Sequence, residues 1–251
     1  MIKNLKDSIR SRVKTVGCFI SIPHPAAVEA TVSDEIDFLC LDAEHASIDR
    51  GTLENMLRAA DASKTPVLVR VPDLKGSWIQ WALDSGAKGI VVPRVETVED
   101  AKRVVDAAYY PPKGCRGVGA SRGSGYGADL ANVVEVAHFD TAVIVQIETY
   151  PGVLNAESIA AVDGIDAVFI GPFDLAQSLL SVPEGSRPTF EEAIQLVELA
   201  CEKANRSMGV FRMNYDDIEK WNNYSLLIIG TDAMFIQTGI KANKSRKKSA
   251  T

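Results

Sequence analysis

Two acidic side chains follow apolar, β-branched runs of the chain. Glu148 comes directly after residues 142–147, and Asp174 follows residues 167–173. Carboxylate oxygens are preferred ligands of hard divalent cations, and Mg²⁺ or Mn²⁺ often takes only one or two of them, which leaves positions for water and substrate. Either acid alone would more often be an ordinary exposed side chain. At equivalent places on two neighbouring strands, the pair predicts a metal-binding site.

A histidine and an arginine belong to two further runs of this kind. His45 follows one run together with Asp42 and Glu44, and Arg70 ends another. An imidazole with an ordinary pKa of about 6.5 suits proton transfer at neutral pH, and a carboxylate three residues earlier can hold its tautomer. An arginine inside an apolar run is costly unless it is paired or binds an anion. Asp84, at the end of the next helix, is a candidate partner, so a structural ion pair and a substrate role both stay open.

Other side chains near the two acids share the expected rim. Side chains two apart on a strand point to the same face, so Gln146 accompanies Glu148. The turn at 171–174 joins a strand to a helix. Its glycine permits close backbone approach, and amides at a helix N-terminus can hold a carboxylate, although a turn chosen for geometry alone would look the same.

Eight short apolar runs alternate with segments of helical period. The alternation predicts parallel strands joined by helices. Strands are expected at 16–22, 38–42, 67–71, 89–92, 143–148, 167–171, 208–211 and 226–229. Helices are expected at 26–32, 50–61, 77–85, 97–107, 128–136, 190–204 and 215–221, and within the first fourteen residues.

We therefore expect an α/β fold, a single (β/α)8 TIM barrel. An open doubly wound sheet is the alternative, and eight units without Gly-x-Gly-x-x-Gly after the first strand disfavour it. The carboxyl ends of barrel strands meet on one rim, where enzymes of this fold keep their sites. The Gly-rich segment 114–127 carries Arg116 and Arg122, and is expected to be a functional loop at that rim rather than a linker.

Length and composition agree with one barrel. The 251 residues divide into an expected barrel domain at 1–240 and a basic, disordered tail at 241–251. A net charge of −6 argues against nucleic acid or an anionic membrane as a partner, and no apolar run reaches the roughly 18 residues that span a bilayer. Four scattered cysteines and the lack of a targeting signal predict a cytoplasmic protein with reduced thiols.

Six segments occur in a characteristic order, at 38–45, 67–71, 86–93, 110–119, 145–149 and 169–175. They include Asp-x-Glu-His, Tyr-Pro-Pro-x-Gly-x-Arg-Gly, Gln-Ile-Glu-Thr and Gly-Pro-x-Asp-Leu, a combination that is specific although each part alone is not. Together they resemble the HpcH/HpaI aldolase/citrate lyase family over about 4–232. The resemblance implies a TIM barrel of the phosphoenolpyruvate/pyruvate type and a class II aldolase or carbon–carbon lyase acting on 2-oxo acids.

The resemblance also implies which residues bind metal and substrate. Glu148 and Asp174 would bind Mg²⁺, Mn²⁺ or a similar ion such as Co²⁺. The substrate, pyruvate or oxaloacetate, would be bound by Gln146, Arg70, Gly171, Pro172, Phe173 and Asp174.

Four residues would carry catalysis by the same resemblance. Arg70 would stabilise the enolate oxygen, and His45, held by Asp42, would move the proton of the C4 hydroxyl. Asp84 matches a position that supports the site from a neighbouring subunit, so a homo-oligomer is expected. The short final helix expected at 234–240 departs from the family and puts its usual hexamer in doubt. The loop at 120–127 is expected to shape the aldehyde end of the pocket.

Several activities fit this pattern. The favoured one is cleavage or formation of 4-hydroxy-2-oxo acids through a pyruvate enolate bound to the metal, with an aldehyde as partner. Oxaloacetate decarboxylation, or macrophomate synthase-like chemistry, would use the same enolate. An inactive barrel would lack at least one of His45, Arg70, Glu148 or Asp174, and all four are present. A Schiff-base aldolase is disfavoured because Lys88 precedes its strand.

Overall fold

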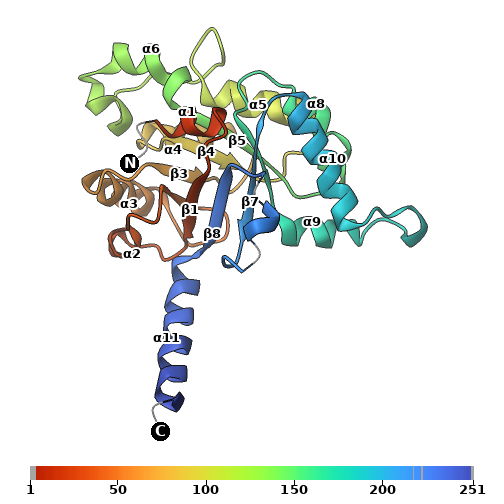
Figure 1. Cartoon of the computed structure of the whole chain (residues 1–251). Coiled ribbons are helices and arrows are strands. Elements are labelled where there is room, and N and C mark those ends of the chain that lie inside the picture. Colours follow the sequence, from red (N-terminus) through yellow and green to blue (C-terminus); the bar gives the residue numbers. More distant parts are fainter. Residues whose placement is uncertain (1–3, 217, 222, 250–251) are drawn as a thin grey trace.

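A computed structural model describes residues 4–216, 218–221 and 223–249 of the chain. Its eight strands form a closed parallel barrel in sequence order, which confirms the predicted fold class (Figure 1). The first strand pairs with the last, Thr15 beside Leu226, and the register shifts between Gly17 and Phe19. The strands are β1 (Thr15–Ile20), β2 (Phe38–Asp42), β3 (Val67–Arg70), β4 (Gly89–Val92), β5 (Ala142–Ile147), β6 (Ala167–Ile170), β7 (Ser207–Arg212) and β8 (Leu226–Thr231).

Helices connect the strands and surround the barrel in Figure 1. Polar caps define several of their starts, including the capping boxes of Thr97 and Thr189. The α-helices are α1 (Leu5–Arg10), α2 (Pro25–Thr31), α3 (Arg50–Ala62), α4 (Gly76–Asp84), α5 (Val98–Ala108), α6 (Leu130–Asp140), α7 (Tyr150–Leu154), α8 (Ala156–Ala160), α9 (Pro172–Leu179), α10 (Phe190–Lys203) and α11 (Asp232–Ser249). The described residues also form the 3-10 helices η1 (Arg122–Gly127), η2 (Glu184–Ser186) and η3 (Ile218–Trp221).

Alternate strand residues pack on the two sides of the barrel wall, because side chains alternate along a strand. One set packs between the barrel and its helices, and the other fills the interior. Glycines make room for the interior rings. A Cβ on Gly17 would lie 2.5 Å from the Phe38 ring, and one on Gly209 would lie 2.7 Å from the Phe169 ring. The barrel is therefore a filled core rather than a pore.

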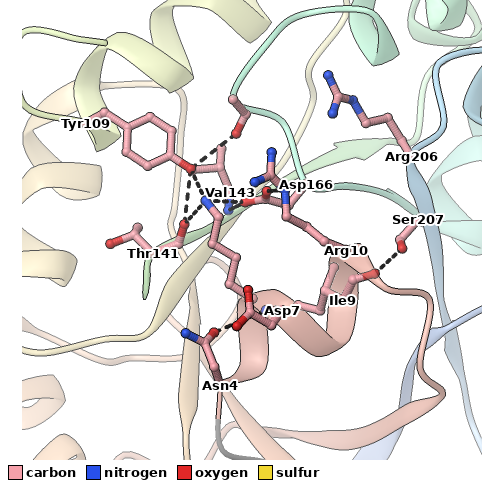
Figure 2. A network of polar contacts seen from close by, with 12 residues as sticks. Asn4, Asp7, Ile9, Arg10, Tyr109, Thr141, Val143, Asp166, Arg206 and Ser207 are labelled. Carbon is pink, nitrogen blue, oxygen red and sulfur yellow. Dashed lines mark hydrogen bonds and ion pairs between the residues drawn. The ribbon is translucent and has the colours of Figure 1, made fainter. Parts of the chain in front are cut away.

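Helix α1 closes the amino-terminal end of the barrel. Its Leu5 and Ile9 belong to the interior cluster, and its Lys6 is buried. The Lys6 Nζ donates to the Tyr109 hydroxyl at 2.6 Å and lies 3.1 Å from the Asp166 carboxylate. Figure 2 shows how Asp166 also binds Arg10.

Burial raises the pKa of Asp166 and lowers that of Lys6, although their attraction opposes both shifts. This polar network lies at the amino-terminal end of the barrel, opposite the rim where the carboxyl ends of the strands meet.

Two expected elements differ from the structure. The helix expected at 215–221 is only the 3-10 helix η3, because Asn214 and Asp216 hydrogen-bond each other locally and hold a turn before it. Where a helix at 234–240 and then a disordered tail were expected, α11 runs from Asp232 to Ser249, because its lysines and arginine are good helix formers. Figure 1 shows α11 leaving the barrel as a separate arm.

Among the helices in the described part of the chain, none has the length and apolar character needed to cross a bilayer.

Candidate active site at the carboxyl ends of the strands

The predicted site residues lie at the carboxyl ends of neighbouring strands. Asp42 ends β2 and Arg70 ends β3, and the two are paired in register. Gln146 is the penultimate residue of β5, and Glu148 follows that strand directly. Because the strands are parallel, these side chains meet at one rim of the barrel.

The Arg70 guanidinium is held from two sides. Its Nε donates to Asp42 Oδ1 at 2.9 Å, and its Nη2 donates to Asp42 Oδ2 at 2.6 Å. Its Nε also lies 3.4 Å from Glu44 Oε2, and its Cζ lies 4.2 Å from the Phe19 ring centre. Burial acts to lower the pKa of Arg70, but the neighbouring carboxylates of Asp42 and Glu44 outweigh burial and raise it. The ion pair that the sequence left open is therefore with Asp42, and the expected partner Asp84 is wrong.

Glu148 is a buried carboxylate with two fixed donors. The Gln146 side-chain amide donates to its Oε2, and the backbone N–H of Arg94 donates to its Oε1 at 2.9 Å. Burial raises the pKa of Glu148 to about 7, helped by the nearby carboxylates of Glu44 and Asp174 and opposed by these two donors. Glu148 and Gln146 share a face, as the period of the strand predicted.

Two backbone features make room for Glu148. A Cβ on Gly171 would lie 2.6 Å from Glu148 Oε2 and 3.0 Å from Gln146 Nε2, so only glycine fits this position. Arg94 has a positive φ of 54°, which costs a non-glycine residue about 1–3 kcal/mol. Arg94 is also the residue whose backbone N–H donates to the Glu148 carboxylate. Nothing in the sequence beyond its place after β4 would have identified Arg94.

Glu44 is a third carboxylate of the site, to which the sequence pattern assigned no role. Burial raises its pKa to about 7, with Arg70 opposing and Asp42 and Asp174 adding to the shift. Its Oε2 is buried and has no hydrogen-bond partner among the described residues. The sequence feature that could have indicated a role for Glu44 is its position between Asp42 and His45 at the end of a strand.

His45 lies at the edge of this cluster. Its side chain is 61% exposed, and its Nε2 lies 3.6 Å from Glu44 Oε2. Asp42 Oδ1 accepts the backbone N–H groups of Glu44 and His45 at 3.1 and 3.2 Å. Asp42 therefore holds the loop and not the imidazole. The carboxylate that faces the imidazole is Glu44, which corrects the expected Asp42–His45 contact.

The turn at 171–174 leads directly into α9. Pro172 is the first residue of the helix, and Phe173 and Asp174 follow it as exposed side chains. N–H groups in a first helical turn have no partner within the helix, so those of Phe173 and Asp174 can bind an anion beside Glu148. The assignment of substrate binding to these residues stays a prediction.

Asp84 does not join the site of its own chain. It ends α4, which starts after β3 and runs back along the barrel, and it binds Arg116 Nη2 at 2.6 Å. The loop with Arg116 and Arg122 lies at this end too, since Arg122 donates to the Ser85 carbonyl at 2.6 Å. The expectation that this loop belongs to the site rim is wrong within one chain, because it connects the end of α5 to α6, the helix that leads into β5.

The donor set fits a divalent cation with two protein carboxylates. Glu148 and Asp174 would provide oxygen ligands, and Gln146 Oε1 and Glu44 Oε2 are buried acceptors without a hydrogen-bond partner in the described chain. The described residues contain no group of three or more acidic, histidine or cysteine side chains placed to hold a metal. Two carboxylates with free positions for water and substrate are typical of Mg²⁺ sites.

A cavity of about 670 Å³ lies at the other end of the barrel, beside Lys6, Arg10 and Tyr109. It shares no lining residue with the rim described above, and we assign no part of the chemistry to it.

Comparison with known proteins identifies the relatives of this chain. The profile of the HpcH/HpaI aldolase/citrate lyase family matches residues 15–234. A 5-keto-4-deoxy-D-glucarate aldolase of Klebsiella pneumoniae subsp. pneumoniae is 34% identical over 230 residues, which cover 90% of each chain. A 4-hydroxy-2-oxovalerate aldolase of Novosphingobium aromaticivorans is 40% identical over 176 residues, 70% of this chain and 67% of that one. The crystal structure of a family protein from Burkholderia cenocepacia J2315 superposes with a TM-score of 0.90 at 31% identity, covering 97% of this chain and 98% of the other.

Proposed function

Because the chain belongs to the HpcH/HpaI aldolase/citrate lyase family, we propose that it is a metal-dependent aldolase that cleaves or forms 4-hydroxy-2-oxo acids. The observation that carries this proposal is the buried Glu148, held by Gln146 and the Arg94 amide on the rim where Asp42 fixes Arg70. The names of the two aldolase relatives support the same class of 2-oxo-acid substrate.

Glu148 and Asp174 would hold the cation. A bound divalent cation, Mg²⁺, Mn²⁺ or Co²⁺, supplies Lewis-acid polarisation of the 2-oxo group. Glu148 is preorganised for this task by its two donors, and Gly171 keeps the space beside it open. The first-turn amides of Phe173 and Asp174 bind the substrate carboxylate, helped by the positive end of α9.

Arg70 stabilises the negative charge that develops during cleavage, and His45 transfers the proton. Arg70 donates to the oxygen on which negative charge develops during cleavage, and its two bonds to Asp42 keep it in place. His45 removes the C4 hydroxyl proton, the C3–C4 bond breaks, and its electron pair forms the pyruvate enolate. Glu44, 3.6 Å from the imidazole, stabilises the protonated His45 until the proton is passed to C3 or to water.

Pyruvate release tests this function. Protein treated with EDTA is incubated with 4-hydroxy-2-oxo acids and with oxaloacetate, before and after Mg²⁺ or Mn²⁺ is restored. We expect cleavage of hydroxy-oxo acids that depends on the metal, and its loss in Glu148→Gln. Activity on oxaloacetate alone would assign a decarboxylase, and no activity on either substrate in folded protein would refute the enolate mechanism.

We also propose that Asp84 serves the site of a neighbouring subunit in a homo-oligomer. The exposed apolar side chains Phe235, Ile236 and Ile240 on α11 support association, because such a surface is costly in water. The four free cysteines are compatible with a cytoplasmic location. Light scattering of the purified protein gives the oligomeric state, and a monomer with full activity would contradict the role of Asp84.

A further inference from the structure

The cavity of about 670 Å³ at the amino-terminal end of the barrel has no part in the proposed aldolase chemistry. Its walls come from α1, α5, α6 and the turn between α8 and β6, segments that are far apart in the sequence. Small-molecule sites in proteins usually have volumes of roughly 300–1,000 Å³. The cavity is therefore large enough to hold a small organic molecule.

The inner wall of this cavity carries a surplus positive charge. Lys6 and Arg10 both bind the Asp166 carboxylate, at 3.1 and 3.0 Å (Figure 2). The buried Lys6 ammonium also donates to the Tyr109 hydroxyl at 2.6 Å and to the Thr141 carbonyl at 2.7 Å. Two cations against one carboxylate leave one positive charge uncompensated, and its field is screened less at a buried site than in bulk water.

Three further nitrogen-bearing side chains line the cavity. They are Lys102 on α5, Lys113 in the turn after α5, and His138 near the end of α6. Within the described part of the chain, none of these side chains forms a hydrogen bond or an ion pair. Partial burial lowers the pKa of His138, and the charges of Lys113 and Lys6 lower it further. The groups repel one another, so an anion placed among them gains charge-assisted hydrogen bonds and relieves that repulsion.

Two carboxylates in the lining set the charge of the preferred ligand. Asp106 and Asp163 are both exposed. The four cations of the lining outnumber them by two, and Asp166 behind the lining reduces this surplus to one. The whole chain has a net charge of −6, so the cavity is a positive region on an acidic protein. This local charge favours a ligand that carries one or two negative charges.

The remaining lining of the cavity is largely apolar. It comes from Val98, Val105, Pro112, Ala161 and Val162. Covering apolar surface stabilises a complex by about 25 cal/mol per Å². A bare inorganic ion would leave this surface in contact with water, whereas an organic ligand with an apolar body would cover it.

We propose that this cavity binds a small organic anion, in which a carboxylate or phosphate group is attached to an alkyl or aryl body. The anionic group lies among Lys102, Lys113 and His138, and the body packs against the valines of α5 and the turn before β6. The proposal does not rest on the aldolase function, because no residue of the lining belongs to the rim at the carboxyl ends of the strands.

Histidine NMR of the full chain, with Mg²⁺ present, tests this site. The chain has three histidines, His24, His45 and His138, so ¹³C-labelled histidine gives three signals that single His→Gln substitutions assign. Phenyl phosphate, benzoate, inorganic phosphate and benzyl alcohol are titrated separately. We expect phenyl phosphate or benzoate to shift the His138 signal saturably and to raise the pKa of His138, because a bound anion favours the imidazolium form. Inorganic phosphate should bind at least about tenfold more weakly, since it covers no apolar surface.

The probes also distinguish the two sources of negative charge. Tighter binding of phenyl phosphate would support a phosphate ester as the ligand, and tighter binding of benzoate would support a carboxylate. The absence of a saturable His138 shift with both aryl anions would overturn the proposal, and so would equally tight binding of the uncharged benzyl alcohol. Inorganic phosphate that binds as tightly as phenyl phosphate would refute the apolar body.

Variants at exposed positions locate the binding in the cavity. Lys113→Gln should weaken the tighter aryl anion at least about threefold, the effect of one exposed charge pair. Ala161→Phe fills the cavity without changing its charge and should weaken binding at least about tenfold. Lys75→Gln is the matched control, because Lys75 is an exposed lysine outside the lining. Unchanged affinity in both cavity variants, or an equal loss in the control, would refute the assignment.

Discussion

The Arg70 guanidinium and the Asp42 carboxylate form two parallel hydrogen bonds across the ends of β3 and β2, at 2.9 and 2.6 Å. The same carboxylate accepts the backbone N–H groups of Glu44 and His45. One buried acid thus fixes both Arg70, which we propose stabilises the enolate oxygen, and the loop that carries His45, which we propose transfers the proton. The arrangement depends on the planar fork of arginine, which lysine lacks.

Replacing Arg70 with Lys should therefore damage catalysis more than stability. We expect kcat/KM for cleavage of a 4-hydroxy-2-oxo acid to fall by about 10²–10³-fold, the usual effect of losing one donor to a developing oxyanion. The loss should appear mainly in kcat. Arg58→Lys is the control, because Arg58 is an exposed arginine bound to Glu54 on α3. A variant within threefold of the wild type would show that Arg70 is only a structural partner of Asp42.

The metal-free protein should lose stability as pH rises through neutrality. Burial raises the pKa of Glu148 and of Glu44 to about 7, from an ordinary value of 4.5. The folded state then binds more protons than the unfolded state between these values, so the free energy of unfolding falls as pH increases from about 4.5 to 7. For the buried Glu148 the loss should be on the order of 1–3 kcal/mol.

Urea unfolding with EDTA at pH 5 to 8 measures this effect. Glu148→Gln cannot ionise, so its stability should change less over the same range. Divalent metal should reverse the slope for the wild type, because binding favours the ionised carboxylates. Parallel pH curves for the wild type and the variant would contradict the shifted pKa of Glu148.

Substituting Gly171 with Ala should displace Glu148. The new Cβ would lie 2.6 Å from Glu148 Oε2 and 2.9 Å from its Cβ, so the carboxylate or the turn must move. We expect Mn²⁺ affinity, measured by electron paramagnetic resonance, to fall by at least about tenfold, with a loss of stability of about 1–3 kcal/mol from overpacking. Gly185→Ala is a matched control, since no atom lies within 4 Å of its added Cβ. Unchanged Mn²⁺ affinity in the Gly171 variant would mean that Glu148 is not a ligand.

At the opposite end of the barrel, Asp166→Ala should affect stability alone. Removing one partner of a buried ion pair leaves Lys6 uncompensated and costs about 3–5 kcal/mol. The exposed pair of Glu157 and Lys203 provides the comparison, and Glu157→Ala should cost less than about 1 kcal/mol. Chemical unfolding gives both values, and kcat per folded molecule should stay unchanged. A large drop in kcat would show that this end communicates with the rim.

The barrel could be predicted from the sequence because its strands are buried on both faces. Runs such as 89–92 stand out as unbroken apolar segments, and the structure places β4 over Gly89–Val92. The short helices α7 and α8 carried no signal of this kind, because five residues are too few to show a helical period. Their region was left without an expected element.

The site was predictable where it follows from strand ends and not where it depends on loops. Glu148, Gln146, Asp42 and Arg70 come together because parallel strands end on one rim. Asp84 was a wrong partner for Arg70, since pairing across β2 and β3 depends on register, which no single segment contains. The position of Glu44 beside the imidazole depends on the path of the loop after β2.

The barrel closes only when its first strand, β1, pairs with its last, β8, and this requirement constrains folding during synthesis. The backbone of Thr15 binds Ser225, and the Ile9 carbonyl accepts a hydrogen bond from Ser207, so the first segments need partners about two hundred residues away. At about 5–20 residues per second, a ribosome supplies those partners only some 10–45 s later. During that interval the apolar Leu5 and Ile9 have no barrel to enter, and the nascent chain must be shielded from its neighbours until its last strands emerge.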